Sequence, residues 1–326
     1  MAPAMTLLEH TVLAIFGPTA SGKSALAEEV ARRIPAEILS ADSMQVYRGL
    51  PILTNQAESA VRLTAIWDLG HQASVGEYGE LAHTAIDEIL AAGRTPIVVG
   101  GTGLYLRAAL AELEVPPPPR PGARERLEAL YDDLGPGKAH ALLAERDPAA
   151  AEAVHAHDRR RVVRALELTE MGISLTPAEN RLWTGEPRHP TVIFGLEVPR
   201  ELLAERIEAR TRAMFERGVE VEVERALAGS LSGTAGQVIG LREVEDLPRD
   251  EAIAAITKRT LQYAAYQKKW MRRIPGLISL SGDRPPEAVA EALLDAATNR
   301  ITLSGQQEAG PSGVRKGKAD PTGHAV

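Results

Sequence analysis

One stretch constrains this chain more than any other: residues 17–24, Gly-Pro-Thr-Ala-Ser-Gly-Lys-Ser, match the phosphate-binding pattern G-x-x-x-x-G-K-S/T at every fixed position. The apolar run at 12–16 predicts a buried strand before it, and the apolar spacing of 25–34 predicts a helix directly after it. In such a unit the backbone N–H groups of the loop and the helix N-terminus turn toward an anion. The stretch therefore predicts a site for a di- or triphosphate, with Lys23 as a point charge and Ser24 as a magnesium ligand.

Composition narrows the possible classes of protein. The 326 residues include 44 acidic side chains against 37 lysines and arginines, and the formal net charge of −7 argues against binding of nucleic acid by bulk charge. A nucleic-acid partner would need a local basic face. The absence of cysteine excludes disulfides, thiolate nucleophiles and thiolate metal sites. No apolar run is long enough to span a membrane and the N-terminus lacks a basic signal-peptide region, so we expect a cytoplasmic protein without membrane contact.

A second polar motif follows the next expected strand. Residues 36–40 predict a short strand, and Asp42-Ser-Met-Gln-Val-Tyr-Arg-Gly49 comes directly after it. In a doubly wound sheet, residues just past the carboxyl end of a strand line the ligand crevice, which places Asp42 beside the phosphate loop. From this position alone, two roles stay open for Asp42: the N-cap of a helix, or a carboxylate that acts on the ligand.

Further elements complete an α/β core with a doubly wound parallel sheet around the phosphate loop (P-loop). Apolar spacing predicts a helix over 77–92 that ends at Gly93 and turns Leu81, Ala85, Ile86, Ile89 and Leu90 inward. The buried strand that starts at Thr95 ends in glycines, without the acidic residue that a motor ATPase usually carries there. We expect further strands at 191–198 and 277–280, a helix at 199–217 and a last helix at 285–297.

The segment after the proline run at 116–119 has a different character. That run predicts a stiff, extended connector, and the residues beyond it carry helical patterns without a credible strand. We expect residues 1–112 and 188–300 to form the core, 113–187 a helical insertion, and 301–326 a disordered tail. Within the insertion, Arg160 and Arg164 stand one helical turn apart, a spacing that suits adjacent phosphates or, equally, a solvated charged face.

A long helix expected over 250–273 combines cations with aromatic residues. Arg259, Tyr263, Tyr266, Trp270 and Arg273 share one side of it at steps of three and four. Such a side could stack on unpaired bases, and the more common alternative is that its aromatic residues pack into the core.

Taken in order, the motifs resemble those of the tRNA dimethylallyltransferases, or IPP transferases, which prenylate the adenosine on the 3′ side of the anticodon. The resemblance covers residues 12–298 and rests on six segments: 17–24, Asp42-Ser-Met-Gln-Val-Tyr-Arg-Gly49, Gly100-Gly-Thr-Gly-Leu-Tyr105, His157-Asp158 with 159–167, Arg200–Ile207 and Gln237-Val-Ile-Gly-Leu-Arg-Glu243. The second of these, after such a phosphate loop, is much more specific than the loop alone.

The resemblance implies a set of site residues. It places the diphosphate of dimethylallyl diphosphate on Gly17, Pro18, Thr19, Ala20, Ser21, Gly22, Lys23 and Ser24, with Mg²⁺ at Ser24. The residues implied for catalysis are Asp42, Thr102 and Lys23, to which we add Arg210 as the arginine on the leaving group. The residues implied for binding tRNA are Asp42, Ser43, Met44, Gln45, Thr102, Arg124, Arg160, Arg161, Val162, Val163, Arg164, Gln237 and Gly240. The insertion would grip the anticodon stem-loop, and we expect a monomer.

The chemistry implied by the resemblance suits these residue types. An adenine amine is a poor nucleophile, so a carboxylate that accepts its proton promotes attack on the allylic carbon, and Asp42 is the candidate. Backbone N–H groups, Lys23, magnesium and an arginine would stabilise the departing diphosphate. The target base has to leave its stack to meet the prenyl donor.

The chain departs from the family pattern in two places. Residues 51–56, Pro-Ile-Leu-Thr-Asn-Gln, replace the common Asp-Ile-Gly-Thr-Ala-Lys, and 264–267, Ala-Ala-Tyr-Gln, replace Ala-Lys-Arg-Gln. Cations are therefore missing at Gln56, Ala265 and Tyr266, although Lys268, Lys269, Arg272 and Arg273 lie nearby in the sequence. Two other functions remain as alternatives: a small-molecule kinase, and an RNA-binding or regulatory protein with a vestigial phosphate loop.

Overall fold

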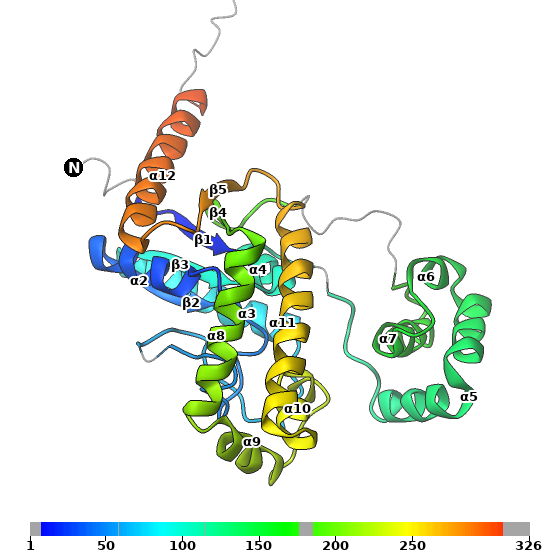
Figure 1. The fold of residues 1–326 in the computed structure, drawn as a ribbon. Coiled ribbons are helices and arrows are strands. Elements are labelled where there is room, and N and C mark those ends of the chain that lie inside the picture. Colours follow the sequence, from blue (N-terminus) through cyan, green and yellow to red (C-terminus); the bar gives the residue numbers. More distant parts are fainter. Residues whose placement is uncertain (1–7, 58, 114, 176–184, 309–326) are drawn as a thin grey trace, which may run out of the picture.

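The core of the protein is a sheet of five parallel strands in the order β2-β3-β1-β4-β5 (Figure 1). The computed structural model describes residues 8–57, 59–113, 115–175 and 185–308. The strands are β1 (Val12–Phe16), β2 (Ala36–Ser40), β3 (Thr95–Gly100), β4 (Thr191–Glu197) and β5 (Ile278–Ser281). β1 and β3 are buried along their whole length, as expected of apolar strands covered on both faces. The expected α/β class is confirmed.

Helices cover both faces of the sheet. Because successive residues of a strand point to opposite sides, Leu13 and Ile15 of β1 face one helical layer and Ala14 and Phe16 face the other. The first layer consists of α2 (Lys23–Arg33) and α12 (Pro286–Glu308), and the second contains α3 (Val75–Ala91) and α4 (Gly103–Leu110). This arrangement puts the loop between β1 and α2 at the carboxyl edge of the sheet, where ligands of doubly wound folds bind.

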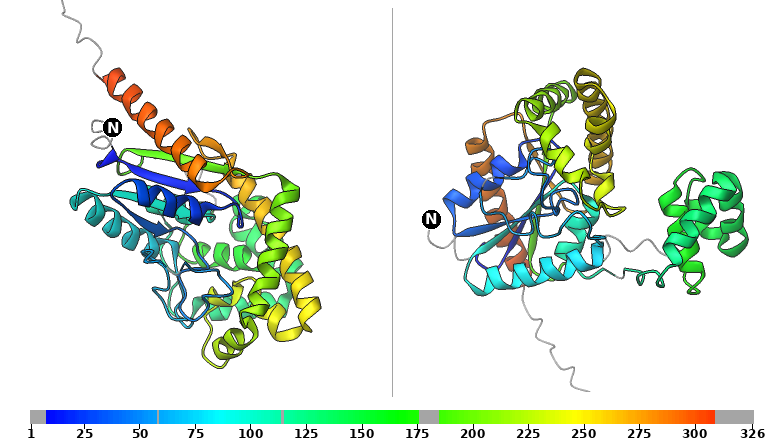
Figure 2. Two further views of the ribbon diagram at one scale, coloured as in Figure 1. Left: turned by 60° about the vertical axis from the view of Figure 1, so that its left-hand side comes forward. Right: turned by 90° about the horizontal axis from the view of Figure 1, so that it is seen from below.

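A second lobe extends beyond that edge (Figure 2). It contains α8 (Arg200–Glu216), α9 (Val219–Leu227), the 3-10 turn Ala235–Gln237, α10 (Leu241–Asp246) and α11 (Arg249–Met271), together with the irregular segment that follows β2. Glu222 of α9 ties this segment down by accepting hydrogen bonds from the backbone N–H groups of Ile52 (2.8 Å) and Leu53 (2.7 Å). Burial raises the pKa of this carboxyl, and the two backbone donors partly offset that rise.

The helices α5 (Ala123–Arg146), α6 (Pro148–Ala153) and α7 (Arg159–Thr169) form a bundle to one side of the core (Figure 1). Leu127, Tyr131, Leu143, Val162 and Leu166 belong to its separate hydrophobic core. A break at Gly135, with φ 75° and ψ 165° just before Pro136, bends α5 so that both of its halves contact the bundle. The insertion expected over 113–187 contains these helices; its two boundaries stay predictions, since residues 114 and 176–184 lie outside the described ranges.

Two local predictions were wrong. Leu81 is 40% exposed, because the buried stripe of α3 runs through Tyr78, Ala82, Ala85, Ile86 and Ile89 and leaves position 81 beside it. The last helix does not end at Ala297: α12 continues to Glu308, and Ile301 still packs against the core there. The rest of the expected disordered tail, 309–326, is outside the described residues. Within the described ranges, none of the helices has the length and apolar character needed to cross a bilayer.

Gly100, at the end of β3, lies in close contact with the chain that leaves β2. A methyl group on Gly100 would overlap the carbonyl oxygen of Ala41, because the chain after β2 passes directly over the end of β3. Gly100→Ala should therefore cost about 1–3 kcal/mol of unfolding free energy or more. Thermal and urea unfolding measure this loss. Gly137→Ala, at a helical position with no heavy atom within 4 Å, is the matched control and should be neutral or slightly stabilising; equal losses in the two variants would contradict the packing argument.

Candidate functional site

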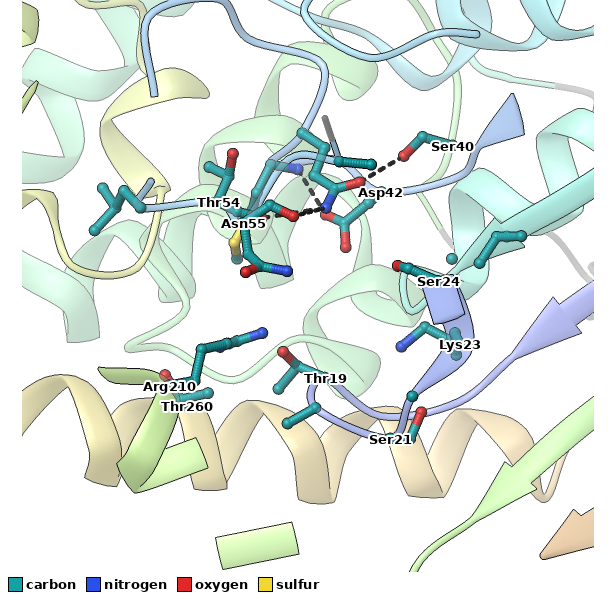
Figure 3. A pocket seen from close by; sticks show the side chains of 18 of the residues that line it. Thr19, Ser21, Lys23, Ser24, Ser40, Asp42, Thr54, Asn55, Arg210 and Thr260 are labelled. Carbon is teal, nitrogen blue, oxygen red and sulfur yellow. Dashed lines mark hydrogen bonds between the residues drawn. The ribbon is translucent and has the colours of Figure 1, made fainter. Parts of the chain in front are cut away.

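A cavity of about 440 Å³ lies between the phosphate loop and the second lobe. Its walls come from the loop before α2, the turn after β2, the segment at 53–55, and the facing sides of α8 and α11. Figure 3 shows Lys23, Asp42 and Arg210 pointing into the same space from three different elements. Positive and negative side chains thus converge on one pocket at the carboxyl edge of the sheet.

The phosphate loop has the conformation that its sequence predicts. Gly22 adopts φ 92°, which few residues other than glycine tolerate, and the non-glycine Ala20 adopts φ 61°. The backbone N–H of Ser21 donates to the carbonyl of Pro18 at 3.2 Å, and Lys23 Nζ donates to the same carbonyl at 2.7 Å. The loop therefore wraps around its own lysine ammonium and leads into the N-terminus of α2.

The ammonium of Lys23 is poorly solvated. Burial lowers its pKa from the ordinary 10.5 to about 8; the neighbouring Asp42 opposes this shift and Arg210 adds to it. Near neutral pH the side chain therefore still carries its charge at a site from which most water has been removed. A desolvated cation of this kind interacts more strongly with an incoming anion than a solvated one would.

Asp42 is not a helix N-cap, because no helix follows it. Its Oδ1 accepts a hydrogen bond from the backbone N–H of Met44 at 2.9 Å, which closes a short turn and orients the carboxyl group. The side chain is half-buried and lines the cavity together with Lys23. Of the two roles that the sequence left open, the capping role is therefore excluded, whereas an action on a ligand stays a prediction.

Arg210 of α8 faces the same cavity from the opposite wall (Figure 3). Its Nε is buried and has no hydrogen-bond partner, and burial lowers the pKa of the guanidinium while Asp42 raises it. A buried donor without an acceptor is costly, so this atom is suited to an acceptor that a ligand supplies. Arg206, one turn earlier, instead donates to the carbonyl of Gly282 at 3.0 Å.

Thr102 connects three elements at the edge of the cavity. Its Oγ1 accepts from the backbone N–H of Ser43 at 3.3 Å and lies 3.3 Å from Ser43 Oγ and 3.2 Å from the Tyr263 hydroxyl. Burial, and then the charge of Asp42, raise the pKa of Tyr263, so its hydroxyl stays protonated. Tyr263 is a site residue that sequence reasoning missed. Its position on the aromatic side of the long helix was the available signal, but the sequence could not show which residue it meets.

The aromatic side of α11 divides between the two roles that were left open. Tyr263 lines the cavity and Trp270 is partly buried over Gly103, where an added methyl group would overlap its ring. Tyr266 is 55% exposed and meets the edge of Trp270 at a centroid distance of 6.4 Å. Packing therefore accounts for Trp270, whereas Tyr263 faces the cavity and Tyr266 presents its ring to solvent.

Gln45 and Gln56 hold the wall of the cavity. Gln45 accepts from Ser40 Oγ at 2.9 Å and donates to the carbonyls of Thr54 (3.2 Å) and Asn55 (3.0 Å). Gln56, where the resemblance led us to expect a cation, donates to the carbonyls of Gln45 (3.3 Å) and Tyr47 (2.8 Å). The missing lysine is thus replaced by neutral hydrogen bonds that fix the loop, and the Gln45 amide is already engaged within the protein.

Six of the residues implied for tRNA binding separate into two groups. Arg124 binds the buried carboxylate of Glu167 at 2.7 and 3.0 Å, and Arg164 donates to Glu167 (2.9 Å) and to the carbonyls of Pro116 (3.1 Å) and Pro117 (2.6 Å). Burial alone would raise the pKa of Glu167, but its arginine partners outweigh burial and lower it. Val162 and Val163 are buried in the bundle core. The structure therefore argues against direct RNA contact through these four side chains.

Arg160 and Arg161 form the other group. Both side chains are exposed at the start of α7, and within the described residues neither forms an ion pair with a carboxylate. The neighbouring Arg159 is occupied by Asp132, at 2.7 and 2.8 Å. The structure does not support the use of Arg160 and Arg164 on adjacent phosphates, one of the two interpretations of their spacing, because Arg164 donates to the proline connector.

The loop at 237–240 borders the same wall. Gln237 is exposed, whereas Gly240 is buried with φ 105° and its N–H donates to Glu243 Oε2 at 3.0 Å. A side chain on Gly240 would meet Leu53, so this glycine serves the close packing of the loop on the cavity wall. Of the two predicted positions, only Gln237 presents a side chain to a partner.

Comparison with known proteins gives consistent matches along the chain. The IPP transferase family model matches residues 45–274, and the isopentenyl transferase model matches residues 10–61. A tRNA dimethylallyltransferase from Streptomyces coelicolor is 42% identical over 284 residues, which cover 83% of this chain and 90% of that relative. One from Thermobifida fusca is 41% identical over 294 residues, covering 84% of this chain and 91% of the relative.

Solved structures agree with these matches. The full-length tRNA isopentenylpyrophosphate transferase from Bacillus halodurans superimposes with a TM-score of 0.66 at 30% identity, covering 92% of this chain and 99% of the other. A eukaryotic dimethylallyltransferase described as acting on tRNA gives a TM-score of 0.68 at 25% identity, covering 92% of this chain and 79% of the other.

The lowered pKa of Lys23 predicts that the protein takes up a proton when an anion binds beside this side chain. A bound anion should raise this pKa above its value of about 8 in the free protein, so the contribution of Lys23 to the affinity for inorganic diphosphate should be full below pH 8 and fall as pH rises above it. Calorimetry at pH 8.5 in two buffers of different ionisation enthalpy measures the uptake, in chelator and without magnesium. Lys23→Met should bind more weakly and take up no proton from this group. An uptake in the variant equal to that of the wild type would assign the proton to another group.

Proposed function

The chain belongs to the family of tRNA dimethylallyltransferases, and from this membership we propose that it transfers a dimethylallyl group from dimethylallyl diphosphate to the exocyclic N6 amine of the adenosine next to the anticodon on its 3′ side, with release of diphosphate. It is thus a prenyltransferase. The observation that carries the assignment to this site is the cavity itself, in which an anion-binding loop with Lys23 faces the carboxylate of Asp42. One pocket thus holds cationic groups for the diphosphate of the prenyl donor and a carboxylate for the proton of the acceptor amine.

The diphosphate end of the site is positively charged. The N–H groups of the phosphate loop, the ammonium of Lys23 and the buried Nε of Arg210 all border the cavity. Breaking the bond between the allylic carbon and oxygen leaves negative charge on the diphosphate, and preorganised donors at that position stabilise it in the transition state. Arg210 then gains the acceptor that it lacks in the free protein.

Asp42 is placed to accept the proton of the attacking amine. Its Oδ1 is engaged by the Met44 N–H, which fixes the plane of the carboxyl group and leaves Oδ2 for the acceptor base. As the amine nitrogen bonds to the allylic carbon, its proton passes to this carboxylate. Thr102, Ser43 and Tyr263 lie on the same side and supply polar contacts that a flipped base could use.

The residues around the phosphate loop suit a magnesium ion that is shared between the protein and the diphosphate. Within the described ranges no three histidine, aspartate or glutamate side chains gather as metal ligands, and Ser24 stands exposed in the first turn of α2. Mg²⁺ commonly takes one or two protein oxygens together with phosphate oxygens and water. We therefore assign Ser24 as the protein ligand, and the bound ion would neutralise part of the charge on the diphosphate.

The alternative functions lose support. The relatives that match over more than four-fifths of the chain are transferases that act on tRNA, not small-molecule kinases. A vestigial loop would not be expected to retain the ammonium, the helix N-terminus and an oriented carboxylate around one cavity. We further propose that the enzyme acts as a cytoplasmic monomer and that the α5–α7 bundle, with Arg160 and Arg161, grips the anticodon stem-loop of the tRNA.

Incubation with unmodified tRNA, dimethylallyl diphosphate and magnesium should yield adenosine that carries one five-carbon prenyl group. Nuclease digestion followed by mass spectrometry of the nucleosides detects it, and omission of the prenyl donor is the control. A parallel incubation contains ATP as well; turnover of ATP without a prenylated nucleoside would instead support a kinase.

Asp42→Asn keeps the shape of the side chain and the bond from Met44 but removes the base. Turnover should fall by about 10²–10⁴, while affinity for the anticodon stem-loop changes little. Single-turnover kinetics and a binding titration measure the two effects separately. Near-normal turnover in this variant would leave Asp42 with only its turn-forming role.

The double substitution Arg160→Ala with Arg161→Ala should weaken tRNA binding, because two phosphate contacts are lost. The log–log slope of affinity against salt should become shallower by about 0.7–0.9 per contact. Binding of the stem-loop over a salt series measures this, with inorganic diphosphate affinity as an internal control that should not change.

Arg164→Ala is the contrasting variant. Because Arg164 holds Glu167 and the proline connector, its loss should lower the unfolding temperature of the bundle and leave the salt slope nearly unchanged. A slope change in Arg164→Ala as large as in the Arg160 and Arg161 variant would mean that all three contact phosphates.

A further inference from the structure

A buried amide on α11 joins the two halves of the site. Gln267 is 2% exposed, and the proposed chemistry gives it no task. Its Oε1 accepts from the backbone N–H of Thr19 at 2.8 Å, and its Nε2 donates to the carbonyl oxygen of Gly101 at 2.9 Å. One side chain thus bonds the phosphate loop at one end and the turn after β3 at the other.

The contact with Gly101 is close. A methyl group at Gly101 would overlap the Gln267 amide and would also lie 3.1 Å from the carbonyl oxygen of Gly17. The phosphate loop, the turn after β3 and the amide therefore occupy one tightly packed place. A shift of either loop has to move the amide or break one of its two bonds.

The bond to Thr19 also bears on a strained residue. Ala20 adopts φ 61°, an unfavourable conformation for a residue with a side chain, and such strain persists where neighbouring contacts enforce it. The Thr19 N–H is held by Gln267 on one side of Ala20, and the Ser21 N–H by the Pro18 carbonyl on the other. Loss of the Gln267 bond would let Ala20 relax and change the direction of the loop N–H groups.

The bond to Gly101 leads to the acceptor side. Gly101 precedes Thr102, whose hydroxyl contacts Ser43 beside Asp42 and Tyr263 of α11. Tyr263 and Gln267 are one helical turn apart on α11, so the same face of this helix holds both loops. Hydrogen bonds and the covalent link between Gly101 and Thr102 therefore connect the anion cradle to the turn that carries the carboxylate.

We propose that Gln267 is a positioning residue that couples the diphosphate cradle to the acceptor loop, so that occupation of one half of the site favours occupation of the other. The identity of the two ligands rests on the proposed function, whereas the coupling of the two loops does not. Because binding free energies are reciprocal, diphosphate should strengthen RNA binding by the same factor by which RNA strengthens diphosphate binding.

Hydrogen exchange of the full chain tests the loop coupling without any substrate. Gln267→Met keeps the length of the side chain and removes both hydrogen bonds. Amides in 17–22 and 100–103 should both exchange faster in this variant. The matched control is Gln262→Ala, which changes an exposed glutamine of the same helix and should leave both segments unchanged. Unchanged exchange in either segment of the methionine variant would overturn the proposal.

Binding experiments test the energetic consequence. The dissociation constant of inorganic diphosphate is measured with and without a saturating anticodon stem-loop. In the wild type and in Gln262→Ala, the ratio of the dissociation constant without the stem-loop to that with it should lie in the usual range of about 5–150. In Gln267→Met the ratio should approach one, and diphosphate alone should bind roughly tenfold more weakly. A ratio of one in the wild type, or an undiminished ratio in Gln267→Met, would overturn the coupling even if prenyl transfer to tRNA is observed.

If Gln267→Met fails to fold, Gln267→Glu keeps the shape and the acceptor for Thr19, and at a pH where its carboxyl is ionised it lacks the donor to Gly101. Exchange should then accelerate at 100–103 and stay slow at 17–22. Acceleration at 17–22 alone, or at neither segment, would contradict the assigned bonds.

Discussion

The close packing of α11 against the turn after β3 is the contact on which the rest of the site depends. Gly100 accommodates the chain that leaves β2, Gly101 accommodates the amide of Gln267, and Gly103 accommodates the ring of Trp270. Larger residues at Gly101 or Gly103 would push α11 away, and with it the hydroxyl of Tyr263 and the wall opposite the phosphate loop. The glycines of this turn thus allow a helix from the second lobe to reach the edge of the sheet.

The electrostatics of the cavity are arranged for a ligand of high negative charge. Lys23 and Arg210 are both desolvated, which lowers the pKa of each, and the carboxylate of Asp42 partly opposes the shift in both. A diphosphate would replace the lost hydration of the two cations and would supply an acceptor for the buried Nε of Arg210. The two desolvated cations and the unpaired Nε are therefore unfavourable interactions that a bound anion would relieve.

An acidic chain can bind tRNA only through a local basic surface, and the structure narrows where that surface lies. Several arginines of the insertion are already engaged: Arg124 and Arg164 with Glu167, and Arg159 with Asp132. These pairs hold the small bundle together and tie it to the proline connector. Arg160 and Arg161, by contrast, are exposed at the start of α7 and form no ion pair with a carboxylate of the described residues.

The sequence by itself determined the class of fold, the five strands, the anion-binding loop and the family, because these depend on local apolar periodicity and on motifs of fixed spacing. It also placed Asp42 beside Lys23 at one edge of the sheet, since carboxyl ends of parallel strands meet there, and the resemblance added Thr102. Only the tertiary structure decided which side chains are free to act. Helical spacing could not show that Arg164 turns to Glu167, that Gln45 is occupied by loop carbonyls, or that Gln267 spans two loops separated by more than 70 residues. Those outcomes depend on partners far away along the chain, and a hydrogen bond of about 3 Å is decided by packing in three dimensions.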